Sequence, residues 1–135
     1  MFAVQIPQHG DSSVLNWISV PKPSPKSDQV LVKIAYTGVN YLDTIQRSGK
    51  YPQTMPFTVG WEASGEIVEV GGAEAQEAGF KIGDRVAFMG PGSHAEYAVI
   101  SINRVIKLPA NVSLEDVSWV AASFLFFTDA SRPVK

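Results

Sequence analysis

The sequence predicts a mainly β fold with short helices, arranged as a partly open antiparallel barrel. Short runs of alternating or β-branched residues recur along the 135-residue chain, and turns rich in proline or glycine separate them. Hydrophobic residues make up 45% of the chain and charged residues 18%, which is typical of a globular protein able to bury a core. These features together favour one compact domain.

Seven segments are predicted to be strands because their apolar residues alternate or are β-branched. They are residues 2–6, 14–20, 30–36, 62–70, 85–89, 94–100 and 104–108. The separators include the proline-rich residues 21–25 and the pair Gly71-Gly72, whose backbone angles do not suit a strand. Many short strands at this spacing favour a small antiparallel barrel.

The first predicted helix covers residues 40–48, where the period of two is broken. Asn40 is a suitable N-cap, Asp43 lies in the first turn, and Gly49 follows the end. We therefore expect a short helix between the third and fourth predicted strands.

The second predicted helix begins after Pro109 and runs to about Phe127. Ser113 with Asp116 three residues later approximates a capping box. Residues 117–127 are apolar on nearly every side, so we expect another domain or chain to cover them. This divides the chain into a domain of residues 1–113 and a connecting helix within residues 114–135.

The net charge and the absence of cysteine exclude some classes of binding partner and location. The 11 Lys and Arg residues against 13 Asp and Glu give a net charge of −2, so we expect no nucleic-acid partner. The chain has no cysteine, and its N-terminus shows no basic region followed by a long apolar run. We expect a cytoplasmic protein with no membrane segment.

Residues 90–95 formally match the glycine-rich dinucleotide fingerprint, Gly-x-Gly-x-x-Ala. That fingerprint works between a strand and a helix, whereas residues 95–100 have strand character. We therefore interpret residues 90–95 as a hairpin loop. The two histidines, His9 and His94, lack a cysteine partner, so we expect no zinc site, and we expect His94 to have a surface or strand-edge role rather than a catalytic one.

An ordered series of motifs extends from residue 38 to residue 86. It reads Gly38-Val39-Asn40-x-x-Asp43, Arg47-Ser48-Gly49-x-Tyr51-Pro52, Gly60-Trp61-Glu62-x-x-Gly65, and Gly83-Asp84-Arg85-Val86. This series resembles the N-terminal GroES-like domain of zinc-free medium-chain dehydrogenases/reductases, in the zeta-crystallin-like quinone oxidoreductase family. Zinc-dependent members have Cys at the position of Asn40 and His at that of Trp61, so the resemblance implies no zinc.

The resemblance implies site residues for an NADPH-dependent reduction of a quinone or enone. Asn40 would lie beside the nicotinamide and, with Tyr51, orient the substrate oxygen as the catalytic pair. The structural alternatives are that Asn40 is a helix cap and Tyr51 a loop-packing residue. Thr128 matches a nicotinamide-contacting threonine, although its neighbours depart from the family pattern. Ile45 and Trp61 would line the substrate pocket.

The resemblance also implies that a Rossmann domain, absent from these residues, follows the last helix. A substrate-side domain alone lacks most contacts to NADPH, so we expect the 135 residues to be inactive by themselves. The alternative is a non-catalytic interaction module that associates with itself or a partner through residues 117–127. A co-chaperonin role would rest on fold alone, which does not imply function.

Overall fold

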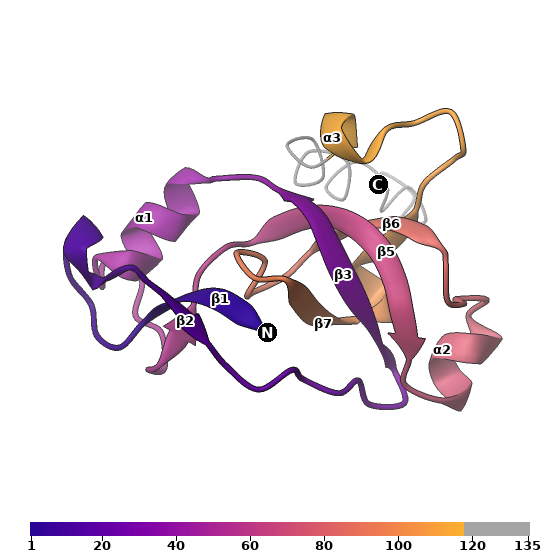
Figure 1. Ribbon diagram of the computed structural model, residues 1–135, viewed down its shortest axis with the longest axis horizontal. Helices are drawn as coiled ribbons and strands as arrows, with labels where there is room; N and C mark the ends of the chain where they lie inside the picture. Colours follow the sequence, from indigo (N-terminus) through magenta and orange to yellow (C-terminus); the bar gives the residue numbers. More distant parts are fainter. Residues whose placement is uncertain (118–135) are drawn as a thin grey trace, which may run out of the picture.

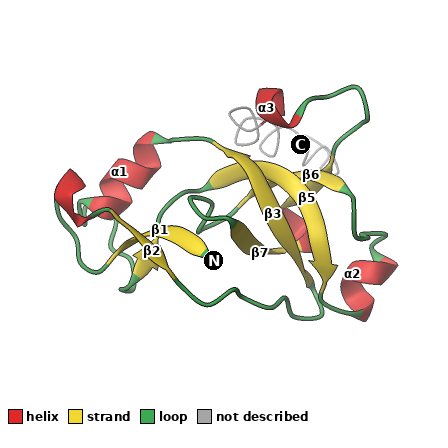
Figure 2. Ribbon diagram, in the orientation of Figure 1, coloured by secondary structure: helices red, strands yellow, loops and turns green. Residues whose placement is uncertain are grey.

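The structure is a computed structural model that describes residues 1–117. Its strands form two antiparallel sheets, shown in Figures 1 and 2. The smaller has the order β2 (Asn16–Ser19), β1 (Phe2–Ile6), β4 (Phe57–Thr58). The larger has the order β7 (Tyr97–Ser101), β3 (Gln29–Thr37), β5 (Glu62–Val70), β6 (Arg85–Met89), β8 (Val105–Lys107).

Helices lie outside the sheets. They are α1 (Tyr41–Arg47), α2 (Ala73–Glu77) and α3 (Leu114–Val117), with 3-10 turns at Ser12–Val14 and Ile102–Arg104. Figure 1 shows α1 beside the β1–β2 hairpin and α2 at the opposite end of the molecule. The predicted mainly β fold with short helices is confirmed.

The larger sheet curls because β3 and β5 do not pair evenly. Their register shifts between Leu31 and Val32 and again between Ile34 and Tyr36. Such irregularities increase local twist and bend a sheet. At Gly65 on β5, a Cβ would collide with the Lys33 carbonyl, so this close crossing needs glycine. The sheet thereby encloses a half-barrel core.

The core is formed by inward-facing residues of the larger sheet together with Ala75 of α2, and Phe88 is its largest fully buried side chain. Its buried members are Val30, Val32, Ala63, Ile67, Ala75, Val86, Phe88, Ala98, Ile100 and Val105. These residues come mainly from the runs in which the sequence pattern predicted strands, and burial of their apolar surface stabilises the fold.

Residues 94–96 join the two sheets. The N–H of Val4 donates to the His94 carbonyl at 2.8 Å, and the N–H of Glu96 donates to the Phe2 carbonyl at 3.0 Å. Ile34 of β3 donates to the Glu96 carbonyl at 2.9 Å. Because these residues serve both sheets, regular β7 begins at Tyr97 rather than at the predicted residue 94.

Three predicted strands, residues 2–6, 62–70 and 85–89, match β1, β5 and β6 to the residue. The predicted strand 14–20 begins later, at Asn16, because the preceding residues form a 3-10 turn. There the Asp11 carboxylate accepts from the N–H of Ser13 at 2.9 Å. Such local side-chain bonds compete with strand formation.

Sequence reasoning missed β4 and α2. The two-residue β4 pairs with Gln5 and Ile6 of β1, and so short a segment shows no periodicity. The five-residue α2 follows Gly71-Gly72, which reads as a turn. It is held by the Ala75 N–H, which donates to the Ser27 carbonyl at 3.1 Å. Both elements depend on contacts distant in sequence.

The two predicted helix starts are confirmed. Asn40 is the N-cap of α1. At α3, Ser113 Oγ accepts from the Asp116 N–H at 3.0 Å, which is one of the two bonds of a capping box, and also donates to Asp116 Oδ2 at 2.6 Å. The predicted continuation to Phe127, and Thr128 beyond it, lie outside the described residues.

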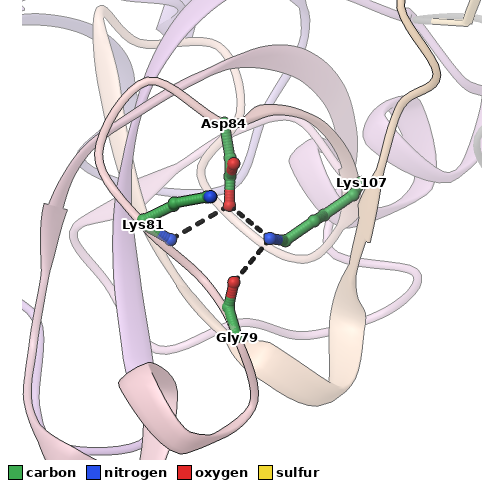
Figure 3. A network of polar contacts seen from close by, with 4 residues as sticks. All are labelled: Gly79, Lys81, Asp84 and Lys107. Atoms are coloured by element: carbon green, nitrogen blue, oxygen red, sulfur yellow. Dashed lines mark hydrogen bonds and ion pairs between the residues drawn. The ribbon is translucent and has the colours of Figure 1, made fainter.

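A polar network fixes the turn before β6 against β8 (Figure 3). Lys107 Nζ lies 2.6 Å from Asp84 Oδ2 and donates to the Gly79 carbonyl at 2.5 Å. The N–H of Lys81 donates to the same Asp84 oxygen at 3.0 Å. Burial raises the pKa of Asp84, but the hydrogen bonds from Lys107 and Lys81 and the positive charges of both lysines outweigh it and lower the pKa.

Among residues 1–117, no helix is both long and apolar enough to cross a membrane.

Candidate active site

Three chain segments meet at the end of the larger sheet nearest α1. They are residues 37–43, residues 59–62 and residues 90–94. The N–H groups of the last segment donate to carbonyls of the second. These bonds are Gly90 to Trp61 at 2.7 Å, Gly92 to Gly60 at 2.9 Å and His94 to Val59 at 3.0 Å. These bonds hold the loop before β7 against the Trp61 motif, and the bond from the Gly38 N–H to the Glu62 carbonyl brings the Asn40 motif to the same place.

Gly60 permits this close approach. Its φ is +99°, a conformation that favours glycine, and a Cβ there would lie 2.7 Å from Cδ2 of His94. The same Cβ would also collide with Ser93 Oγ and with the His94 N–H. Residue 60 therefore has to be glycine for both backbone and packing reasons.

The backbone that carries Asn40 is held from several sides. The N–H of Asn40 donates to Asp43 Oδ2 at 2.7 Å, which ties it to the first turn of α1. The Gly38 N–H donates to the Glu62 carbonyl at 3.2 Å, and the Gly38 carbonyl lies 3.1 Å from His94 Nε2. Half-buried His94 lies three residues before β7, and its ring contacts the backbone that carries Asn40.

The side chain of Asn40 faces a buried acid. Asn40 Nδ2 donates to Glu62 Oε1 at 2.8 Å, and Glu62 is 3% exposed. Asn40 itself is half-buried. The interpretation of Asn40 as only a helix cap is therefore incomplete, because its side-chain amide also donates to Glu62 of β5.

Two hydroxyl groups, those of Thr37 and Ser93, also link these segments. Thr37 Oγ1 donates to the Glu62 carbonyl at 2.9 Å and lies 2.9 Å from Ser93 Oγ. Ser93 is completely buried. These bonds connect the end of β3, the start of β5 and the loop before β7.

Tyr51 lies on the loop after α1, and its side chain is 57% exposed. Its N–H donates to the Ile45 carbonyl at 3.1 Å, which folds the loop back over the helix end. His9 supports the loop, because its Nε2 accepts from the Gln53 N–H at 3.3 Å. Asn40 and Tyr51 thus flank a seven-residue helix, about 10 Å long at ~1.5 Å per residue.

The two predicted pocket residues are both half-buried. Ile45 lies on α1 between Asn40 and Tyr51. Trp61 precedes β5, and the Arg104 guanidinium lies over its ring, 5.8 Å from the centroid. An open cleft of about 350 Å³ lies elsewhere, between residues 20–23 and β7, and none of the predicted site residues lines it.

Residues 90–95 form a loop between β6 and β7, which do not pair with each other, so the predicted hairpin is wrong, whereas the rejection of the dinucleotide fingerprint is supported. Strand β7 follows them, not a helix. The N–H groups of Gly90, Gly92 and His94 are already bonded to carbonyls of residues 59–61. They are therefore not free to bind a pyrophosphate.

The charged and polar groups near α1 include two buried atoms without partners. Within residues 1–117, these are Asp43 Oδ1 and Gln46 Oε1. Residues 1–117 contain no group of three or more His, Cys, Asp or Glu side chains able to hold a metal ion.

Sequence reasoning missed Glu62, Thr37 and Ser93 as parts of the site. Glu62 stood inside the quoted Gly60-Trp61-Glu62 motif, and a carboxylate at the start of a buried strand is the signal that marks it. Thr37 and Ser93 carried no such signal, because their pairing depends on the meeting of segments 56 residues apart.

Comparison with protein families matches residues 26–110 to the alcohol dehydrogenase GroES-like domain. A probable quinone oxidoreductase of Schizosaccharomyces pombe is 38% identical over 116 residues, which are 85% of this chain and 35% of that protein. The quinone oxidoreductase of Lama guanicoe is 37% identical over 120 residues, 85% of this chain and 36% of that protein. The chain thus spans about a third of the length of these relatives.

The fold has close counterparts among solved structures. Escherichia coli quinone oxidoreductase, solved in complex with NADPH, superimposes with a TM-score of 0.82 at 28% identity. The match covers 87% of this chain and 36% of the E. coli chain.

Proposed function

The chain belongs to the alcohol dehydrogenase GroES-like domain family, in its quinone oxidoreductase branch, and from this premise we propose that it is the substrate-side domain of an NADPH-dependent, zinc-independent quinone or enone reductase. The observation that carries the proposal is Asn40, whose backbone and side chain are both fixed at the meeting point of three segments. Tyr51 and Thr128 complete the proposed set of polar residues, and Ile45 and Trp61 the pocket.

NADPH, when bound, supplies a hydride to the conjugated carbonyl substrate. The residues of this chain stabilise the negative charge that develops on the substrate oxygen. The Asn40 amide and the Tyr51 hydroxyl can each donate a hydrogen bond to that oxygen. Tyr51 is exposed, as a side chain that meets a substrate must be before binding.

The described residues fit one end of NADPH. Asn40 offers an amide to the nicotinamide, and its fixed backbone provides the positional precision that hydride transfer needs. Residues 90–95 do not fit the pyrophosphate, because their N–H groups are bonded within the chain. We therefore propose that the phosphates of NADPH are held outside residues 1–117.

A chimera tests this proposal. The chain replaces the matching segment of E. coli quinone oxidoreductase, which binds NADPH. We expect the purified chimera to oxidise NADPH when a quinone is added. Asn40→Ala should lower kcat/KM by roughly 100-fold, as for the loss of an oxyanion donor. Tyr51→Phe should lower it by roughly tenfold, equivalent to ~1.4 kcal/mol.

Matched controls are Asn16→Ala on β2 and Tyr41→Phe on α1, both exposed and outside the proposed set. Each should leave kcat/KM within about twofold. A folded chimera that binds NADPH but reduces neither quinones nor enones would contradict the substrate-side role.

The 135 residues alone should neither bind NADPH in a calorimetric titration nor reduce quinones. Micromolar binding by the isolated chain would show that it builds a full cofactor site and would contradict the proposed division of labour. The alternative role, docking through residues 117–127, stays a prediction, since all of these residues but Val117 lie outside the described part.

A further inference from the structure

We propose that Glu62 is a positioning residue that sets both the rotamer and the amide orientation of Asn40. The inference rests on the proposed function, because it concerns how Asn40 meets its ligand. It adds a residue, Glu62, to which the motif comparison assigned no role.

The contact is short and buried. Asn40 Nδ2 lies 2.8 Å from Glu62 Oε1, and Glu62 is 3% exposed. A buried carboxylate is stable when hydrogen bonds compensate for its lost hydration, so a donor at this position is needed. The amide of Asn40 is such a donor.

Glu62 is itself fixed at the backbone. Its carbonyl accepts from Thr37 Oγ1 at 2.9 Å and from the Gly38 N–H at 3.2 Å. The strand position of Glu62 is therefore tied to the same segment that carries Asn40 two residues later. Backbone and side-chain contacts between the two segments reinforce each other.

The chemistry of a carboxylate decides the orientation of the amide. An ionised carboxylate accepts hydrogen bonds and donates none, whereas an amide has a donor end and an acceptor end. Nδ2 of Asn40 faces Glu62 Oε1, and a 180° flip would instead place the acceptor Oδ1 against a carboxyl oxygen. One N–H of Nδ2 is bonded to Glu62. The second N–H of Nδ2 and the acceptor Oδ1 are then available to a ligand in a defined orientation.

Asp43 and Glu62 hold different parts of Asn40. Asp43 Oδ2 accepts from the Asn40 backbone N–H at 2.7 Å, while Glu62 acts on the side chain. Loss of Glu62 should therefore free the Asn40 side chain while its backbone remains held at the start of α1.

The first test is a spectroscopic signature in the 135-residue chain. The side-chain N–H₂ group of Asn40 is followed by ¹⁵N–¹H NMR in the wild type, Glu62→Gln and Glu62→Ala. We expect one Nδ2 proton to be shifted downfield in the wild type. The shift should shrink in Glu62→Gln, whose amide oxygen still accepts, and disappear in Glu62→Ala. Glu66→Gln, an exposed residue of the same strand, should change nothing.

Unchanged Asn40 side-chain signals in a folded Glu62→Ala protein would overturn the proposal. If Glu62→Ala does not fold, the isosteric Glu62→Gln decides, and wild-type Asn40 signals there would overturn it equally. The NMR signals do not depend on turnover, so they test the role of Glu62 separately from the proposed function.

The second test is a double-mutant cycle in the chimera with E. coli quinone oxidoreductase. Glu62→Gln should lower kcat about tenfold with KM nearly unchanged, and should have no further effect in the Asn40→Ala background. An equal loss in both backgrounds would show that Glu62 acts independently of Asn40 and would overturn the positioning role. An inactive wild-type chimera would count against the proposed function, and the NMR signature would still decide the role of Glu62.

Discussion

At the scale of single residues, a few positions determine the shape of the site. Gly60 allows three segments to approach one another, and Asn40 is fixed by two acids that act on different parts of it. The identities of these residues follow from space and charge. Substitutions at these positions should therefore change the local geometry of the site.

Gly60→Ala should destabilise the protein more than Gly79→Ala. Both glycines have positive φ, +99° and +86°. Alanine at either position would be strained by the left-handed backbone, which lowers the free energy of unfolding by ~1–2 kcal/mol. A Cβ at Gly60 would also collide with Ser93 and His94, whereas a Cβ at Gly79 meets nothing within 4 Å. We expect at least ~1 kcal/mol of extra loss at Gly60, measured by urea denaturation. Equal losses would contradict the close packing.

Asp84 should contribute stability that depends on pH. Its pKa is lowered from 3.8 in the folded protein, so its contribution is present above 3.8 and is lost as the pH falls through the lower folded-state value. The side chains of Lys107 and Asp84 are 40% and 15% exposed, and solvent screens the pair. Asp84→Asn should therefore cost about 1 kcal/mol at pH 7.

Denaturation of Asp84→Asn, Lys107→Met and the double variant measures this coupling. The coupling free energy should be favourable at pH 7 and should shrink below pH 3.8, as Asp84 becomes protonated. A coupling that persists unchanged into strong acid would show that the network in Figure 3 does not depend on the carboxylate charge.

At the scale of elements, α1 and the loop after it present the proposed catalytic pair. Asn40 precedes the helix and Tyr51 follows it, with the loop returning over Ile45. The segment at residues 9–10 holds the end of α1, because Gly10 and Arg47 exchange hydrogen bonds of 3.0 and 2.9 Å, and it supports the loop through His9, which accepts from the Gln53 N–H. The placement of Tyr51 thus depends on the N-terminal hairpin.

His9→Ala should loosen the Tyr51 loop without unfolding α1. It removes the acceptor for the Gln53 N–H and the ring that packs on Gly49. Loss of one such bond, ~1 kcal/mol, should speed hydrogen exchange at Gln53 roughly fivefold. The Gly10 N–H, bonded to Arg47 and not to His9, is the internal control. Unchanged exchange at Gln53 would show that His9 does not support the loop.

At the scale of the whole molecule, the two sheets share residues 94–96, and the curled larger sheet holds the core. The proposed site lies where the ends of β3, β5 and the loop before β7 meet, so its geometry depends on the packing of the larger sheet. Stability of the core and integrity of the site should therefore be lost together.

Phe88→Ala should be the most damaging single truncation of an apolar side chain in the core. Phe88 is fully buried, and such changes cost ~3–5 kcal/mol, a large part of the stability of a small domain. Phe2→Ala is the matched control, because Phe2 is 45% exposed and should cost much less. Denaturation followed by circular dichroism compares them. A mild effect of Phe88→Ala would contradict the core assignment.

Most strands were predictable because alternation of apolar residues reports which face of a strand is buried, and the helix caps at Asn40 and Ser113 were predictable because capping is a local interaction. The short β4 and α2 were not, since each is held by partners far away in sequence. Asn40, Tyr51, Ile45 and Trp61 were proposed from their motifs, and their roles in catalysis stay predictions.

The fold class, most strand-forming segments and the family of the chain could be derived from the sequence alone, because periodicity, turn residues and ordered motifs are local properties of the chain. Only the tertiary structure decided which groups surround Asn40. The contacts of Asn40 with Glu62, of Thr37 with Ser93 and of Gly38 with His94 join residues 22 to 56 positions apart. Such contacts exist because the sheet curls, and no local pattern encodes where a curled sheet brings its ends together.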